Sequence, residues 1–181
     1  MEHVFRLNQF GKRQLWTREK ARTIRAQLVS ELEELQEGDV LVIDASDVEV
    51  FDFSFANELF GRTVIELPQS YPGRFVVVEN LLKYAKENLE RALEGMGLSM
   101  IERQGETLRL IGKVHPIDKQ TFVAVAKRET PATAAQLSER LGVGLNAVNE
   151  RLSKLVGLGL VRRETSTSPA GREQYEYSVL A

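Results

Sequence analysis

The sequence contains no cysteine and only two histidines, His3 and His115, among its 181 residues. Without cysteine the chain has no disulfide, no thiolate nucleophile and no thiolate-based metal site. Each histidine stands alone in the sequence, so a zinc or iron site would have to recruit carboxylates through the fold. We therefore expect two surface histidines, and neither a bound metal nor another cofactor.

Long apolar runs are also missing. No stretch approaches the roughly 20 apolar residues that a membrane helix needs, and residues 1–6 lack the basic start and apolar run of a secretory signal. These absences favour a cytoplasmic protein. The composition, 43% apolar and 28% charged, suits a packed core under a polar surface, and the length allows two small domains.

Charge of one sign does not dominate, because the net charge is −2. Residues 1–115 hold 15 basic and 19 acidic side chains, whereas residues 116–181 hold 9 and 7. This mild asymmetry permits the C-terminal part, but not the N-terminal part, to face a polyanion such as nucleic acid.

The segment Gly112-Lys113-Val114-His115-Pro116 is the best candidate for a linker. Pro116 has no amide donor and disfavours helix in the residue before it. We therefore predict two domains, over residues 1–113 and 117–181.

The first domain alternates strand-like and helix-like segments. Continuous apolar runs rich in β-branched residues over 40–43 and 75–78 indicate strands that are buried on both faces. Apolar residues at helical spacing predict helices over 17–37, 54–68 and 81–93, and short strands are expected over 4–7, 100–102 and 108–111. The order β-α-β-α-β-α-β-β predicts an α/β domain with a largely parallel sheet.

The second domain has a different pattern. Helices are expected over 121–127, 134–141 and 146–156, with turns over 130–133 and 142–144. A strand follows residues 159–161, and an alternating return strand covers 174–179 after a polar turn. Helix-helix-turn-helix followed by a hairpin is the layout of a winged helix-turn-helix domain, which is α+β.

Residues 133–155 and the segment Gly159-Leu160-Val161-Arg162-Arg163 carry a resemblance to winged helix-turn-helix transcription factors such as MarR-like and ArsR-like repressors. In the helix over 146–156, Val148, Leu152 and Leu155 form the expected core face. The resemblance implies that this helix enters the DNA major groove while the hairpin contacts flanking phosphates or the minor groove.

The expected DNA-binding side chains lie off that core face and on the hairpin: Asn146, Asn149, Ser153, Lys154, Arg162, Arg163 and Arg172. The expected partner is double-stranded DNA, bound by a twofold homodimer across paired half-sites. Glu150, on the same helix, would repel phosphate, so a winged helix that contacts proteins alone remains open.

Residues 42–61 carry a second resemblance. Asp44, Val48, Asp52 and Ser54 follow the pattern of STAS domains, the fold of anti-sigma factor antagonists, and of the related STAS-like family, over residues 10–112. In a STAS domain the helix-opening serine is a phosphorylated switch, and Ser54 falls at that place. A regulatory protein of kinase or anti-sigma type would then be the partner. Phe53 and Phe55 replace the usual small residue and glycine, which puts the switch in doubt.

Several interpretations of these residues remain open. Ser54 precedes an apolar-periodic helix and can act as its cap instead of a phosphosite. Asp44, Asp47 and Asp52 can hold Mg²⁺ or serve as solvated turn formers. In the helix over 17–37, basic residues come early and acidic ones late, which opposes the helix dipole. We find no catalytic constellation and do not expect an enzyme.

Two functions from different classes follow. The first is a DNA-binding transcriptional regulator whose STAS-like domain senses a partner, a ligand or self-association. The second is a protein-interaction switch, of anti-sigma antagonist or kinase-partner type, that makes no contact with DNA.

Overall fold

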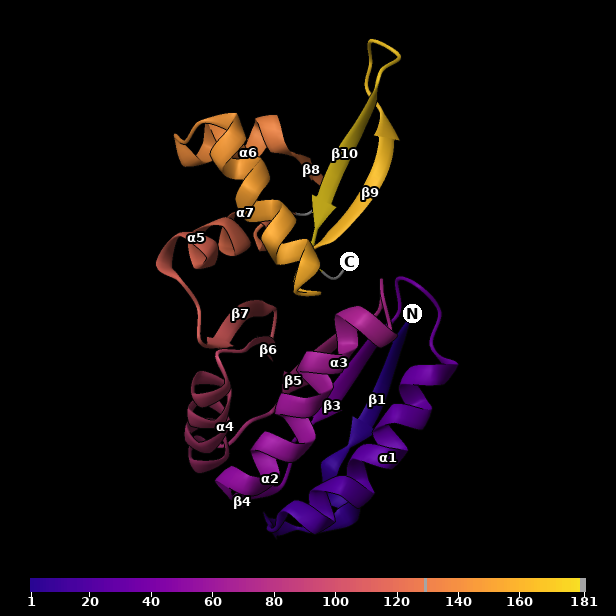
Figure 1. Cartoon of the computed structure of the whole chain (residues 1–181), viewed down its shortest axis with the longest axis vertical. Coiled ribbons are helices and arrows are strands. Elements are labelled where there is room, and N and C mark those ends of the chain that lie inside the picture. The colour runs from indigo at the N-terminus through magenta and orange to yellow at the C-terminus, as the bar shows by residue number, and fades with distance from the viewer. Residues whose placement is uncertain (129, 180–181) are drawn as a thin grey trace. The chain divides into compact units, whose positions relative to one another are not determined.

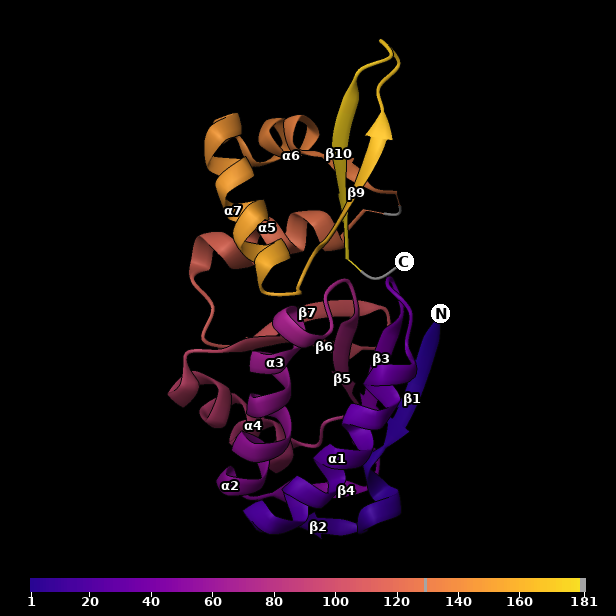
Figure 2. The ribbon, with the colours of Figure 1, turned by 45° about the vertical axis from the view of Figure 1, so that its right-hand side comes forward.

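The computed structural model describes residues 1–128 and 130–179. The chain divides into two compact units, Met1–Val114 and His115–Ala181 (Figures 1 and 2). Within the described residues, no helix is both long enough and apolar enough to span a bilayer.

A five-stranded sheet forms the centre of the first unit. Its order is β1-β3-β5-β6-β7, with β1 (Glu2–Arg6), β3 (Val40–Asp44), β5 (Phe75–Glu79) and β6 (Ser99–Gln104) parallel. β7 (Thr107–Gly112) returns antiparallel to β6 after a turn at Gly105, whose φ of +57° suits glycine. The sheet is therefore mixed and largely parallel, as the alternation of strands and helices predicts.

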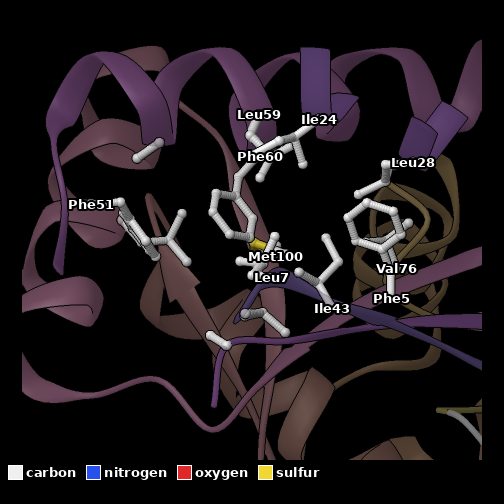
Figure 3. Packing of buried hydrophobic residues seen from close by; sticks show 14 of the residues in the cluster. Phe5, Leu7, Ile24, Leu28, Ile43, Phe51, Leu59, Phe60, Val76 and Met100 are labelled. Atoms are coloured by element: carbon white, nitrogen blue, oxygen red, sulfur yellow. The ribbon is translucent and has the colours of Figure 1, made fainter. Parts of the chain in front are cut away.

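Three helical stretches pack on this sheet. They are α1 (Arg18–Glu34), the continuous run of α2 (Phe53–Ala56), η2 (Asn57–Gly61) and α3 (Arg62–Ser70), and α4 (Lys83–Met96). Their inward side chains join one buried cluster with strand residues such as Phe5, Ile43 and Val76 (Figure 3). Within it, the ring of Phe51 lies 5.8 Å from Phe55 and 5.3 Å from Phe60, centroid to centroid.

The second helical stretch differs from the predicted helix over 54–68. It starts at Phe53, includes a π-helical turn at η2, and continues through Pro68 to Ser70. Pro68 lies in the last turn, where its missing amide forfeits one hydrogen bond and the helix ends two residues later.

Two short strands were not predicted. β2 (Arg13–Leu15) and β4 (Val48–Phe51) pair in parallel as a separate sheet. The backbone has a positive φ at Arg13 (+71°), the first residue of β2, and at Asp47 (+65°), the residue before β4. A further short helix, η1 (Leu7–Phe10), follows β1. Segments this short carry little periodicity, and their pairing joins positions more than 30 residues apart.

A buried carboxylate explains the charge order of α1. Glu58, on η2, is 5% exposed, and the Nε atoms of Arg18, Arg22 and Arg25 lie 3.5–3.8 Å from its oxygens. Arg25 also forms an ion pair of 2.8 Å with Glu66. The basic residues at the start of α1 therefore serve a tertiary charge network at the expense of the helix dipole.

The second unit contains α5 (Pro116–Ala126), β8 (Ala132–Thr133), α6 (Ala134–Leu141), α7 (Leu145–Gly157), β9 (Arg162–Thr167) and β10 (Glu173–Ser178). The strands form an antiparallel sheet of order β8-β10-β9. α5 starts earlier than the predicted Thr121, because Pro116 occupies the first helical turn and His115 is the N-cap. The segment 130–133, predicted to be a turn, contains β8.

Candidate nucleic-acid interface

Local contacts fix the connection between α6 and α7. Thr133 and Gln136 form a capping box at the start of α6, and Gly142 ends that helix with a φ of +63°. The hydroxyl of Ser138 donates a hydrogen bond of 2.5 Å to the carbonyl of Val143. These contacts cap both ends of α6 and tie it to the turn that leads into α7.

α7 has one buried side and one exposed side. Val148, Leu152 and Leu155 are at most 1% exposed and pack in the core of the unit. Because the helix repeats every 3.6 residues, the opposite side carries the exposed side chains of Asn146, Asn149 and Ser153. None of these three side chains forms a hydrogen bond with the residues that the structure describes, so their polar groups are available to a ligand.

Lys154, predicted to contact DNA, is held inside its own unit. Its Nζ lies 2.5 Å from Oδ2 of Asp118 in the first turn of α5. The side chain of Asp118 is 7% exposed, whereas that of Lys154 is 57% exposed. A buried carboxylate needs a counter-charge, so Lys154 neutralises Asp118 and is not a free basic group beside Asn149 and Ser153.

A cleft of about 450 Å³ lies beside this ion pair, between the start of α5 and α7. Its walls are formed by His115, Ile117, Asp118, Ala147, Glu150, Arg151 and Lys154. His115 is exposed, and its Nδ1 accepts a hydrogen bond of 3.4 Å from the amide of Ile117. The cleft is lined by charges of both signs, and Glu150 forms no ion pair within the described ranges 1–128 and 130–179.

The hairpin of β9 and β10 carries the predicted arginines, and its turn projects beyond the helices of the same unit (Figures 1 and 2). The guanidinium of Arg163 stacks over the ring of Tyr175 at 4.7 Å, a cation–π contact that holds the charge on an exposed surface. Arg172, at the turn, is exposed, and its amide donates to Oγ of Ser168 at 3.1 Å. Arg162 is half-buried and lies 3.4 Å from Glu164.

Tyr175 was not among the predicted site residues, although strand alternation could have placed it beside Arg163. In the register of the hairpin, Tyr177 lies opposite Arg163, and Tyr175 lies one diagonal step away on the same face. Burial raises the pKa of Tyr177, with a smaller opposing effect of Arg163. Arg163 and Arg172 therefore form the exposed basic part of the hairpin, supported by an aromatic ring.

Residues 114–180 match the family model of the sugar-specific transcriptional regulator TrmB. The match covers nearly all of the second unit and, of the first unit, only Val114. The second unit is thus similar to a transcriptional-regulator domain. No curated protein matches the chain.

Among solved structures, a possible transcriptional regulator from Methanosarcina mazei Go1 is similar to this chain, with 16% sequence identity and a TM-score of 0.34. The similarity covers 38% of this chain and 57% of that one. The chain thus matches little more than half the length of that relative, and a likeness of this size carries no argument about function.

Ser54 is not the cap of its helix. The N-cap is Asp52, whose Oδ1 accepts from the amide of Phe55 at 2.7 Å and whose Oδ2 accepts from the amide of Thr17 at 3.2 Å. Ser54 lies in the first turn, half-buried, next to Phe53, which is 49% exposed. Ser54 is the second residue of α2 and so lies inside the helix, whereas Asp52 stands at the N-cap position. Capping by Ser54 was therefore a wrong prediction. Its phosphorylation stays a prediction.

The three aspartates proposed for Mg²⁺ have separate partners. Asp44 accepts hydrogen bonds from Ser46 and from Nδ2 of Asn80, the latter at 2.9 Å. Burial raises the pKa of Asp44, but these hydrogen bonds outweigh burial and the net pKa is lowered. Asp47 accepts from Asn8, and Asp52 caps α2. Among the described residues, no group of three potential ligands comes together.

Proposed function

We propose that the protein is a DNA-binding transcriptional regulator whose second unit is a winged helix-turn-helix domain. The observation that carries the proposal is the exposed polar side of α7, formed by Asn146, Asn149 and Ser153, whose side chains have no hydrogen-bond partner among residues 1–128 and 130–179. The similarity of residues 114–180 to a transcriptional-regulator family supports it.

The chemistry of this side suits a base edge. An α-helix fits the major groove, and an asparagine amide can donate to N7 and accept from N6 of adenine at the same time. Ser153 can donate or accept. Since the amides have no competing partner in the described chain, binding a base does not require breaking a hydrogen bond between side chains.

The hairpin supplies the contacts that do not depend on base sequence. Arg163 and Arg172 are exposed on β9 and at the turn, where guanidinium groups can pair with phosphates or enter the minor groove. The contact with the Tyr175 ring restrains the side chain of Arg163, which lowers the entropy that this arginine loses on binding.

The first unit is, in this proposal, a STAS-like signalling domain that receives a signal through a partner, a small ligand or self-association. The motif from Asp44 to Ser54 motivates that assignment. In this proposal the regulator is a cytoplasmic protein without enzymatic activity. It is expected to be a homodimer, because DNA-binding proteins with twofold symmetry bind paired half-sites. Light scattering with and without DNA measures the oligomeric state, and a monomer in both conditions would contradict this part.

The test is fluorescence anisotropy of the full chain with a randomised duplex library at several salt concentrations. The wild type should bind with a strong salt dependence, and Arg163→Gln with Arg172→Gln should flatten the log–log slope by about 0.9 for each phosphate that is no longer neutralised. The matched control replaces two exposed arginines of the first unit, Arg13→Gln and Arg62→Gln, and should leave the slope unchanged. Absence of binding at low salt would reject the proposal.

A protein-interaction switch is the second candidate. The half-buried Ser54, whose hydroxyl has no hydrogen-bond partner within the described chain, lies next to the exposed ring of Phe53. A phosphate there would add charge beside Asp52, which already occupies the cap, so it would repel that carboxylate. Capture of an ATP-binding kinase-like protein by wild type but not by Ser54→Asp would favour the switch. Equal capture by both would argue against it.

A further inference from the structure

Glu150 is an acidic residue in the middle of the proposed DNA-binding side. It lies one helical turn after Asn146 and one before Ser153, so all three share the outward side of α7. Its side chain is exposed and forms no ion pair or hydrogen bond with the part of the chain that the structure describes. A free carboxylate at this place is unexpected, because phosphate repels it.

The sequence places a possible ion-pair partner for Glu150 one helical turn later, but in the fold this partner pairs with another residue. A glutamate four residues before a lysine forms a stabilising helical pair, and Lys154 occupies that position. The Nζ of Lys154, however, lies 2.5 Å from the buried carboxylate of Asp118. Coulomb attraction is stronger in the less polar surroundings of Asp118 than at the exposed Glu150. Because Lys154 pairs with Asp118, it does not neutralise the negative charge of Glu150.

Arg151 also lines the cleft beside Glu150. It is half-buried, and successive helix residues point about 100° apart, so it does not share the outward side. Among the described residues, Arg151 forms no ion pair with Glu150, and Asp118, the other charged residue of the cleft besides Lys154, is itself an acid.

An uncompensated carboxylate in the major groove needs a hydrogen-bond donor. In that groove the cytosine N4 amino group is the donor that glutamate accepts from most readily. We propose that Glu150 is a specificity-determining residue that selects a C·G pair at one position of each half-site. This inference rests on the proposed function, since it concerns how α7 reads DNA.

The test is selection of sites from the randomised duplex library by wild type, Glu150→Gln and Glu139→Gln. Glu139 is an exposed acid on α6 and matches the change in charge. The wild type should select cytosine at one position, and Glu150→Gln should weaken that preference at least about fivefold while keeping the others. Glu139→Gln should keep it, and both variants should bind non-specific DNA more tightly to a similar extent.

The outcomes separate the two proposals. If the wild type selects a site and Glu150→Gln selects the same site with the same preference for cytosine, this inference is overturned and DNA binding stands. If the wild type binds no duplex, the proposed function and this inference fail together. Glu150 is exposed and contributes nothing to the core, so unchanged thermal melting of Glu150→Gln controls for folding.

Asp118→Asn tests how Glu150 is kept free. This change releases Lys154, which can then pair with Glu150 and weaken the preference for cytosine although the carboxylate is still present. The double variant Asp118→Asn with Lys154→Met should recover the preference, because no lysine remains to neutralise Glu150. An unchanged preference in Asp118→Asn would show that Asp118 does not act as a positioning residue.

Discussion

At the scale of single residues, the ion pair between Asp118 and Lys154 is asymmetric. One side chain is almost fully buried and the other is more than half exposed. Removing the exposed partner leaves a buried charge without compensation, whereas removing the buried charge leaves a lysine that water can solvate. The stability of the second unit should therefore depend more on Lys154 than on Asp118.

We expect Lys154→Met to lower the free energy of unfolding by about 2 kcal/mol and Asp118→Asn to lower it by less than about 1 kcal/mol. Urea unfolding of the two variants at neutral pH measures the difference. An equal or larger decrease in Asp118→Asn would contradict this expectation. A DNA-binding defect in a Lys154 variant would therefore report on stability as well as on direct binding.

Asp52 and Ser54 give a second comparison between neighbouring residues. Asp52→Ala should cost about 1 kcal/mol of stability, because the amide of Phe55 loses its cap and the amide of Thr17 loses its acceptor. Ser54→Ala should change stability by only a few tenths of a kcal/mol. Thermal unfolding of both variants checks the order, and a larger decrease in Ser54→Ala would restore Ser54 as the cap.

At the scale of elements, Glu58 ties α1 to the π-helical turn η2. Glu58→Gln should destabilise the first unit by about 1–2 kcal/mol, because three arginines lose a common, nearly buried counter-charge. Glu66→Gln is the matched control. Its carboxylate is 40% exposed and, among the described residues, forms an ion pair with Arg25 alone, so its effect should be smaller. Urea unfolding that ranked Glu66→Gln above Glu58→Gln would contradict the importance of this network.

Helices and long strands could be predicted from the sequence, since apolar spacing determines them locally. The apolar residues Val148, Leu152 and Leu155 alone place Asn146, Asn149 and Ser153 on the opposite side of α7. The features that the sequence did not reveal depend on contacts distant in sequence. Lys154 pairs with Asp118, 36 residues earlier, while its contact with DNA stays a prediction, and β2 pairs with β4 across α1 and β3. The cap at Asp52 and the π turn at η2 were missed because local rules allow several competing solutions there.

At the scale of the whole molecule, the two units differ in construction and charge. The first has a largely parallel sheet and an excess of acids, whereas the second has three helices among its described residues, a hairpin that carries three arginines and three glutamates, and more basic than acidic residues. This difference in construction and charge is compatible with the proposal that one unit receives a signal and the other contacts DNA.

The most direct test of DNA binding by the second unit is hydrogen–deuterium exchange of the full chain with and without a duplex selected from the randomised library. We predict that DNA slows exchange in α7 and in the hairpin of β9 and β10. Binding that leaves both segments unprotected, with protection confined to the first unit, would contradict the proposal.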